Sequence, residues 1–238
     1  MTRVILEHII HLVIVLPIIL LTLKNRSLEN LKILLAFSIF FMANGVLLYL
    51  PIEFDELRII NGRWNWTGKI LAILGAIIFL LVYRKFHLKD YFLTFKQHKK
   101  SLKSGIIAIL VVFLVSTILN FKFNTPTSEW HTETILYQFT MPGINEEIAF
   151  RGIMLGLLVK ILKPNSIAML ITALLFGMAH GLFLNQNFEL IFKSQPFFQT
   201  TIMGMIWAWV TIKTGSILLA LLSHNLGNVS GKIISVIK

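Results

Sequence analysis

The chain has 238 residues, of which 56% are hydrophobic and only 14% are charged, and its mean hydropathy is +0.78. Soluble domains contain roughly 45–50% apolar and about 25% charged residues, so this composition excludes an ordinary soluble protein and indicates one that faces lipid. The chain contains no cysteine, which excludes disulfides, thiolate metal ligands and a cysteine nucleophile.

The net charge of +11 has the sign expected of a nucleic-acid-binding protein, but its distribution favours a membrane instead. The densest basic cluster lies between two apolar runs and comprises Arg84, Lys85, Lys89, Lys96, Lys99, Lys100 and Lys103. Basic loops between membrane spans are what the positive-inside rule describes. We therefore expect membrane lipids as partners and no nucleic acid.

Taken in chain order, the apolar runs predict about eight transmembrane helices, since a span needs about 20 residues. The predicted spans are residues 4–23, 31–51, 68–83, 104–121, 144–162, 166–184, 197–212 and 216–236. Helices are expected because the runs lack the alternation of a barrel strand, and only helices and closed barrels satisfy their backbone in lipid. The fold class is therefore an all-α, polytopic membrane protein.

The segments between these runs carry the signals of interfaces and turns. The first run is followed by Lys24-Asn25-Arg26 without a small-residue cleavage site, so it is interpreted as a retained span rather than a signal peptide. Residues 122–143 form a polar segment with Pro126 and Pro142, and a short amphipathic helix is expected near 132–139. Most of the 22 Lys and Arg residues fall in loops on one side, which places both termini outside.

The run 144–162 carries three ionisable residues, although charge at the bilayer centre costs at least about 2.5–3.5 kcal/mol per residue. Glu147 and Arg151 are spaced i and i+4, so they can pair along one helix face. Glu146 points about 100° away and is left for another partner, where it can act as a general base on water. The alternative is an ordinary charged helix start, since acids are favourable at helix N-termini.

Two later runs carry polar residues of their own. His180 lies near the end of its run and, taken alone, is more typical of a hydrogen-bonded residue at the interface. His224 and Asn228 share a helix face, and their alternative role is hydrogen bonding between helices. Because spans alternate in direction, Glu146, His180 and His224 are all predicted to lie in the same half of the membrane.

Together these residues form three ordered motifs, which are Glu146-Glu147-x-x-x-Arg151, Phe176-x-x-x-His180 and His224-x-x-x-Asn228. Their order and their placement on successive hydrophobic segments resemble the signature motifs of the CPBP family. That family comprises CAAX proteases and bacteriocin-processing enzymes and is also called the Abi family. The stretch 204–216 resembles the segment between the last two motifs. The resemblance covers residues 137–232, and the first 120 residues show only hydrophobic spans.

The resemblance implies an intramembrane endopeptidase whose catalytic core is residues 122–238, preceded by N-terminal transmembrane helices in residues 1–121. It implies that Glu146 activates water with help from His180. It also implies that His224 and Asn228 stabilise the oxyanion. Arg151 would hold the Glu147 side of the helix, with Phe176 as a further supporting residue of its motif.

Zinc is the cofactor that the sequence leaves open. Glu146, His180 and His224 would be its ligands, because His₂Glu is a known catalytic set. The sequence has no H-E-x-x-H, in which the spacing itself argues for zinc. The same side chains can also act as base and oxyanion donors, so we favour the mechanism without a metal.

The predicted function is therefore hydrolysis of a peptide bond in a membrane-associated peptide or protein, by a multi-pass protein of the cell membrane. The alternative is a non-catalytic immunity or scaffold protein of the same fold. A transporter is disfavoured, because its buried charges would form a path across the membrane, whereas these gather in one half.

Overall fold

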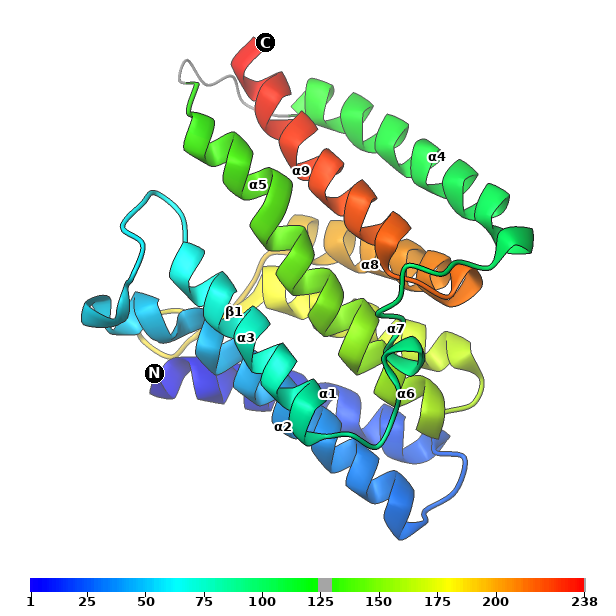
Figure 1. Cartoon of the computed structure of the whole chain (residues 1–238). Helices are drawn as coiled ribbons and strands as arrows, with labels where there is room; N and C mark the ends of the chain where they lie inside the picture. Colours follow the sequence, from blue (N-terminus) through cyan, green and yellow to red (C-terminus); the bar gives the residue numbers. More distant parts are fainter. Residues whose placement is uncertain (124–129, 238) are drawn as a thin grey trace.

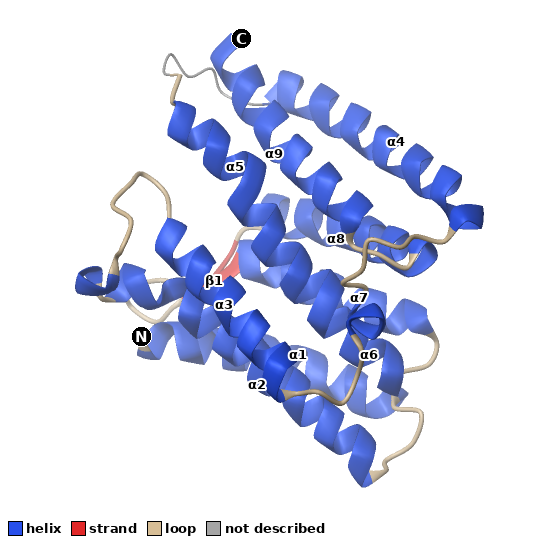
Figure 2. Ribbon diagram, in the orientation of Figure 1, coloured by secondary structure: helices blue, strands red, loops and turns tan. Residues whose placement is uncertain are grey.

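The computed structural model describes residues 1–123 and 130–237, and this part of the chain is almost entirely helical (Figure 2). The fold class predicted from the sequence is confirmed. The α-helices are α1 (Thr2–Thr22), α2 (Leu28–Glu53), α3 (Trp66–Val82), α4 (Lys99–Phe123), α5 (Thr132–Glu146), α6 (Leu155–Ile161), α7 (Asn165–Gly181), α8 (Ser194–Thr214) and α9 (Leu218–Ile237). Short 3₁₀ turns are η1 (Asp55–Leu57) and η2 (Leu88–Tyr91), and η3 (Glu147–Met154) is a π-helix. An antiparallel hairpin pairs β1 (Leu182–Leu184) with β2 (Leu190–Phe192).

The helices differ in how much of a bilayer they can cross. Among the described residues, three helices are long and apolar enough to span by length and composition: α1, α2 and the Lys99–Ile118 part of α4. The helices α3 and α7 are apolar but shorter. The predicted spans thus correspond to helices, but these have unequal apolar lengths.

The fifth predicted span begins earlier than expected. Helices α5, η3 and α6 follow one another without a break, so a single helical segment runs from Thr132 to Ile161 with Pro142 inside it. The helix predicted near 132–139 is present and begins at Thr132, but it continues into the fifth span instead of ending as a short separate helix. Pro126 of the predicted polar segment lies outside the described residues. Proline is tolerated inside membrane helices because neighbouring groups satisfy the backbone that it frees.

This continuous helix changes the position of Glu146. Glu146 was expected in the first turn of a span, but it lies in the middle of the continuous segment, at the end of α5. The alternative of an ordinary charged helix start is therefore wrong, because no free backbone N–H groups of a helix N-terminus are near it. Its charge has to be balanced by side chains.

The continuous helix forms the centre of the bundle (Figure 1). Every residue from 149 to 158 is buried, as expected of a helix that other helices surround. Helix α5 contacts α3 on one side and α9 on the other, and α7 packs along α8. Helix α4 lies against α8 and α9, far from α1 in Figure 1.

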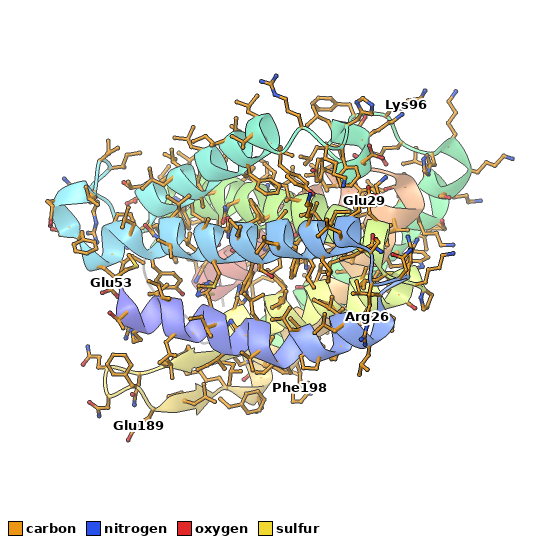
Figure 3. All side chains as sticks on the ribbon, turned by 90° about the horizontal axis from the view of Figure 1, so that it is seen from below. Arg26, Glu29, Glu53, Lys96, Glu189 and Phe198 are labelled. Atoms are coloured by element: carbon orange, nitrogen blue, oxygen red, sulfur yellow. The ribbon has the colours of Figure 1, made fainter. Side chains whose placement is uncertain are left out.

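The loops gather at the two ends of the bundle as the alternating spans predict. Figure 3 shows Glu53 and Glu189 towards one end and Arg26 and Lys96 towards the other. At the second end Lys160 of α6 donates a hydrogen bond of 2.6 Å to Asp90, which lowers the pKa of that carboxyl. This interaction ties the basic loop to the central helix.

The arrangement predicts which loops face the cytoplasm. The chain has no cysteine, so single-cysteine variants can be labelled cleanly. We expect Asn61→Cys to react with a membrane-impermeant maleimide in intact cells, and Lys96→Cys to react only after permeabilisation, because the end with most of the Lys and Arg residues stays inside. Labelling of Lys96→Cys from outside would reverse the orientation.

Candidate active site

Three ionisable side chains from different helices converge at one point inside the bundle. Oε2 of Glu146 at the end of α5 lies 3.6 Å from Nε2 of His224 on α9 and 3.9 Å from Nε2 of His180 on α7. These distances exceed a direct hydrogen bond and suit a bridging water. Among the described residues, this buried oxygen has no hydrogen-bond partner. The structure therefore brings together the three residues that the sequence placed in one membrane half.

Glycine allows α9 to come close enough to α5 for this contact. A Cβ at Gly143, one helical turn before Glu147, would collide with the amide oxygen of Asn225. Asn225 directly follows His224, so the absence of a side chain at Gly143 sets how near His224 comes to Glu146. A small residue at a crossing between membrane helices is the usual device for such close packing.

The second carboxylate, Glu147, fixes His224 and is itself neutralised. Its Oε1 lies 2.8 Å from Nδ1 of His224 and accepts a hydrogen bond of 3.2 Å from Nη1 of Arg151. The Glu147 and Arg151 side chains are 0% exposed, and their i, i+4 pairing follows the predicted spacing. Because a carboxylate can only accept, Nδ1 of His224 carries the proton and donates it.

Aromatic rings hold the cation and both imidazoles. The Arg151 guanidinium lies 4.2 Å from the centroid of the Phe176 ring, and Phe176 meets His180 edge-on at 4.6 Å. Trp207 of α8 stacks on His224 with ring centroids 4.4 Å apart. A Cβ at Gly204 would stand 3.0 Å from Nη2 of Arg151, so this glycine leaves room for the guanidinium. Sequence reasoning identified Phe176 and missed Trp207, although Trp207 falls inside the stretch 204–216 that resembles the family.

The second histidine is oriented by its own helix. Nδ1 of His180 lies 2.8 Å from the backbone carbonyl of Phe176. A carbonyl only accepts, so Nδ1 carries a proton, and the neutral ring presents Nε2 to Glu146 as an acceptor. The His180 side chain is 36% exposed, against 6% for His224. His180 is thus the more accessible of the two imidazoles.

One residue in contact with Glu146 was missed by the sequence. Nζ of Lys69, on α3, lies 2.7 Å from Oε1 of Glu146 and 3.4 Å from Oδ1 of Asn145. Asn145 in turn bonds Asn44 of α2 at 3.5 Å. Lys69 stands near the start of the apolar run 68–83, and sequence reasoning gave it no role in the site. The feature of the sequence that could have identified Lys69 is a lysine inside the first turn of a short hydrophobic helix.

The site opens into a cavity of about 670 Å³, within the usual range for pockets that hold a ligand. Glu146, His180, His224 and Lys69 all line it, together with residues of α4 and α8. Asn228 lines it one turn after His224 and makes no side-chain hydrogen bond with the described residues.

The positions of the side chains bear on the zinc ligands that the sequence left open. Within residues 1–123 and 130–237, no group of three or more His, Cys, Asp or Glu side chains is arranged to hold a metal ion. Glu146, His180 and His224 have the right donor types, but one oxygen of Glu146 is already paired with the ammonium of Lys69. No step is therefore assigned to a metal below.

Residues 128–230 match the family model described as Type II CAAX prenyl endopeptidase Rce1-like. This match agrees with the resemblance of the three motifs to the CPBP family. All three motifs lie within the matched residues, whereas Lys69 and Asn44 precede them. No curated protein and no solved structure matches the chain.

The buried ion pair of Glu147 and Arg151 predicts a large effect on stability. Glu147→Gln leaves the guanidinium of Arg151 without a counter-charge in a place that water does not reach, which we expect to destabilise the protein by about 3–5 kcal/mol. Asp55→Asn is the matched control, because Asp55 pairs with Arg58 at 3.3 Å on the exposed surface, where such pairs contribute about 0–1 kcal/mol. Unfolding in detergent measures both, and equal effects would contradict the assignment.

Proposed function

We propose that this protein is an intramembrane endopeptidase in which Glu146 activates a water molecule to hydrolyse a peptide bond. A single observation carries the proposal: a buried carboxylate oxygen that has no hydrogen-bond partner in the described part of the chain faces Nε2 of two histidines at 3.6 and 3.9 Å. This spacing suits one water held between the three side chains. The cavity beside it has room for the scissile bond.

The reaction follows from these positions. Glu146 takes a proton from the water, helped by Nε2 of His180 as an acceptor, while the oxygen forms a bond to the carbonyl carbon and the carbonyl electrons move onto its oxygen. When the intermediate collapses, the C–N bond breaks and the proton passes from Glu146 to the leaving amine. Atoms and charges then balance without a covalent enzyme intermediate.

The developing oxyanion requires hydrogen-bond donors. Asn228 lines the cavity one turn from His224 and offers a side-chain amide. Nε2 of His224 can donate only when the ring carries both protons, and Glu147, 2.8 Å from Nδ1, stabilises that imidazolium. Each such donor contributes about 2.7–4 kcal/mol to the transition state. The same Glu147 side chain that holds the histidine therefore prepares it to donate.

A non-catalytic scaffold or immunity protein of this fold would explain the helices but not the charges. Ionisable side chains inside a membrane protein are costly and are retained where they have a function. A scaffold has no use for a carboxylate that faces two imidazoles across a cavity. The endopeptidase accounts for this placement directly.

The substrate we propose is a membrane-associated peptide or protein. The matched family is described as a CAAX prenyl endopeptidase family, so a prenylated peptide is the natural first probe. The apolar helices place the cavity within a membrane protein. A lipid-modified or membrane-embedded chain would therefore reach the site without leaving the bilayer.

Substitution of the base tests the proposal. We expect the wild-type protein in lipid nanodiscs to cleave a farnesylated CAAX peptide or a member of a library of membrane-inserting peptides, with one ¹⁸O from labelled water in the new carboxyl terminus. Glu146→Gln should lower this rate at least about 10²-fold, because it removes the general base. Mass spectrometry measures both. Cleavage by Glu146→Gln at the wild-type rate would refute the mechanism.

Removal of metal is the second test. We expect dialysis against EDTA and 1,10-phenanthroline to leave cleavage of the same peptide unchanged, because Lys69 rather than a metal is the cation paired with Glu146. Inhibition that a chelator causes by extracting a metal is reversed when the metal is added back. Loss of activity that added zinc restores would show that Glu146, His180 and His224 hold a metal after all.

A further inference from the structure

We propose that Lys69 is a catalytic residue, whose ammonium pairs with Glu146 before the reaction and stabilises the oxyanion after Glu146 has taken the proton of water. This inference rests on the endopeptidase function proposed above. It assigns part of the active site to α3, which lies outside the residues that match the family. Figure 1 shows α3 alongside α5, and the two helices are in contact.

The contact is short and shielded from water. Nζ of Lys69 lies 2.7 Å from Oε1 of Glu146, the typical length of a charge-assisted hydrogen bond. The two side chains are only 9% and 13% exposed. The oxygen that Lys69 binds is the one that does not face the histidines, so the ammonium leaves Oε2 free to receive the proton of water.

The position of Lys69 in its helix makes this burial significant. It is the fourth residue of α3, near the interface, where a lysine side chain normally extends towards water. Here the ammonium turns inward, to Glu146 and to Oδ1 of Asn145. The preceding Gly68 lets α3 approach α2, because a Cβ there would collide with the carbonyl oxygen of Leu48. The fold therefore directs this charge into the site.

The two buried ion pairs have different positions relative to the substrate. Arg151 and Glu147 are fully enclosed and do not line the cavity. Lys69 and Glu146 both line it. Arg151 thus neutralises a carboxylate that stays charged, whereas Lys69 neutralises the one that changes its charge during the reaction.

That difference assigns the role of Lys69 in each step. With Glu146 ionised, the ammonium offsets the cost of a carboxylate away from water. Once Glu146 is protonated, the negative charge has moved to the carbonyl oxygen of the substrate, and the ammonium is left facing that charge in a site of low dielectric. Lys69 therefore acts on the transition state, so its loss should lower kcat much more than it changes KM.

The experiment separates the effect of the charge at position 69 from the effect of the size and shape of the side chain. The variants are Lys69→Met, Lys69→Arg and Lys69→Ala, assayed on the peptide that the wild type cleaves. Lys32→Met is the matched control, because Lys32 is an exposed lysine near the start of α2. We expect Lys69→Met to lower kcat about 10²-fold or more with KM within about threefold. Lys69→Arg should retain part of the activity, and Lys32→Met all of it.

Chemical rescue separates the charge from the fold. We expect methylammonium to restore activity to Lys69→Ala in a dose-dependent way, and to have no effect on Glu146→Gln. If Lys69→Met has the kcat of the wild type while Glu146→Gln is inactive, the catalytic role of Lys69 is refuted and the endopeptidase function is not. If Lys69→Met and Lys69→Ala both fail to fold, Lys69 serves the stability of the protein, and its catalytic role is refuted. A wild type no more active than Glu146→Gln would instead refute the proposed function itself.

Discussion

The structure depends on the balance of four charges inside a bundle of apolar helices. Glu146 and Glu147 are adjacent in sequence, and neither could stay ionised away from water without a partner. Each has its own cation, Lys69 at 2.7 Å and Arg151 at 3.2 Å. Together the four groups carry no net charge. The surrounding helices can therefore be as apolar as a membrane requires while the site remains ionic.

Adjacency on one helix is what gives the two carboxylates different roles. Successive residues point about 100° apart, so Glu146 faces the cavity while Glu147 faces the interior of the bundle. His224 spans this angle, because its two ring nitrogens reach the two carboxylates separately, Nδ1 at 2.8 Å and Nε2 at 3.6 Å. The helix changes to π geometry at Glu147, a feature that is frequent at functional sites.

The parts of the site that sequence could predict are those set by spacing along one helix or by alternation of spans. The i, i+4 rule gave the pair of Glu147 and Arg151, and alternation placed His180 and His224 in the same half of the membrane as Glu146. The sequence could not predict contacts between helices that lie far apart in the chain. Lys69 reaches Glu146 across a separation of 77 residues, and no local pattern encodes that meeting. The continuous helix through Pro142 was missed for a related reason, since proline ends helices in water and is tolerated where other helices pack around it.

The N-terminal helices therefore do more than anchor the matched core. Asn44 of α2 bonds Asn145, Asn145 accepts from Lys69, and Lys69 binds Glu146. Helix α1 adds a further restraint, because Glu7 accepts a hydrogen bond from the backbone of Leu184 and His11 bonds the carbonyl of Leu182, in the strand that begins two residues after His180. Both Glu146 and the more exposed histidine are thus held by residues outside the family match. A core cut from this chain would keep every signature motif and lose the ammonium that pairs with Glu146, so the motifs alone do not define the candidate site.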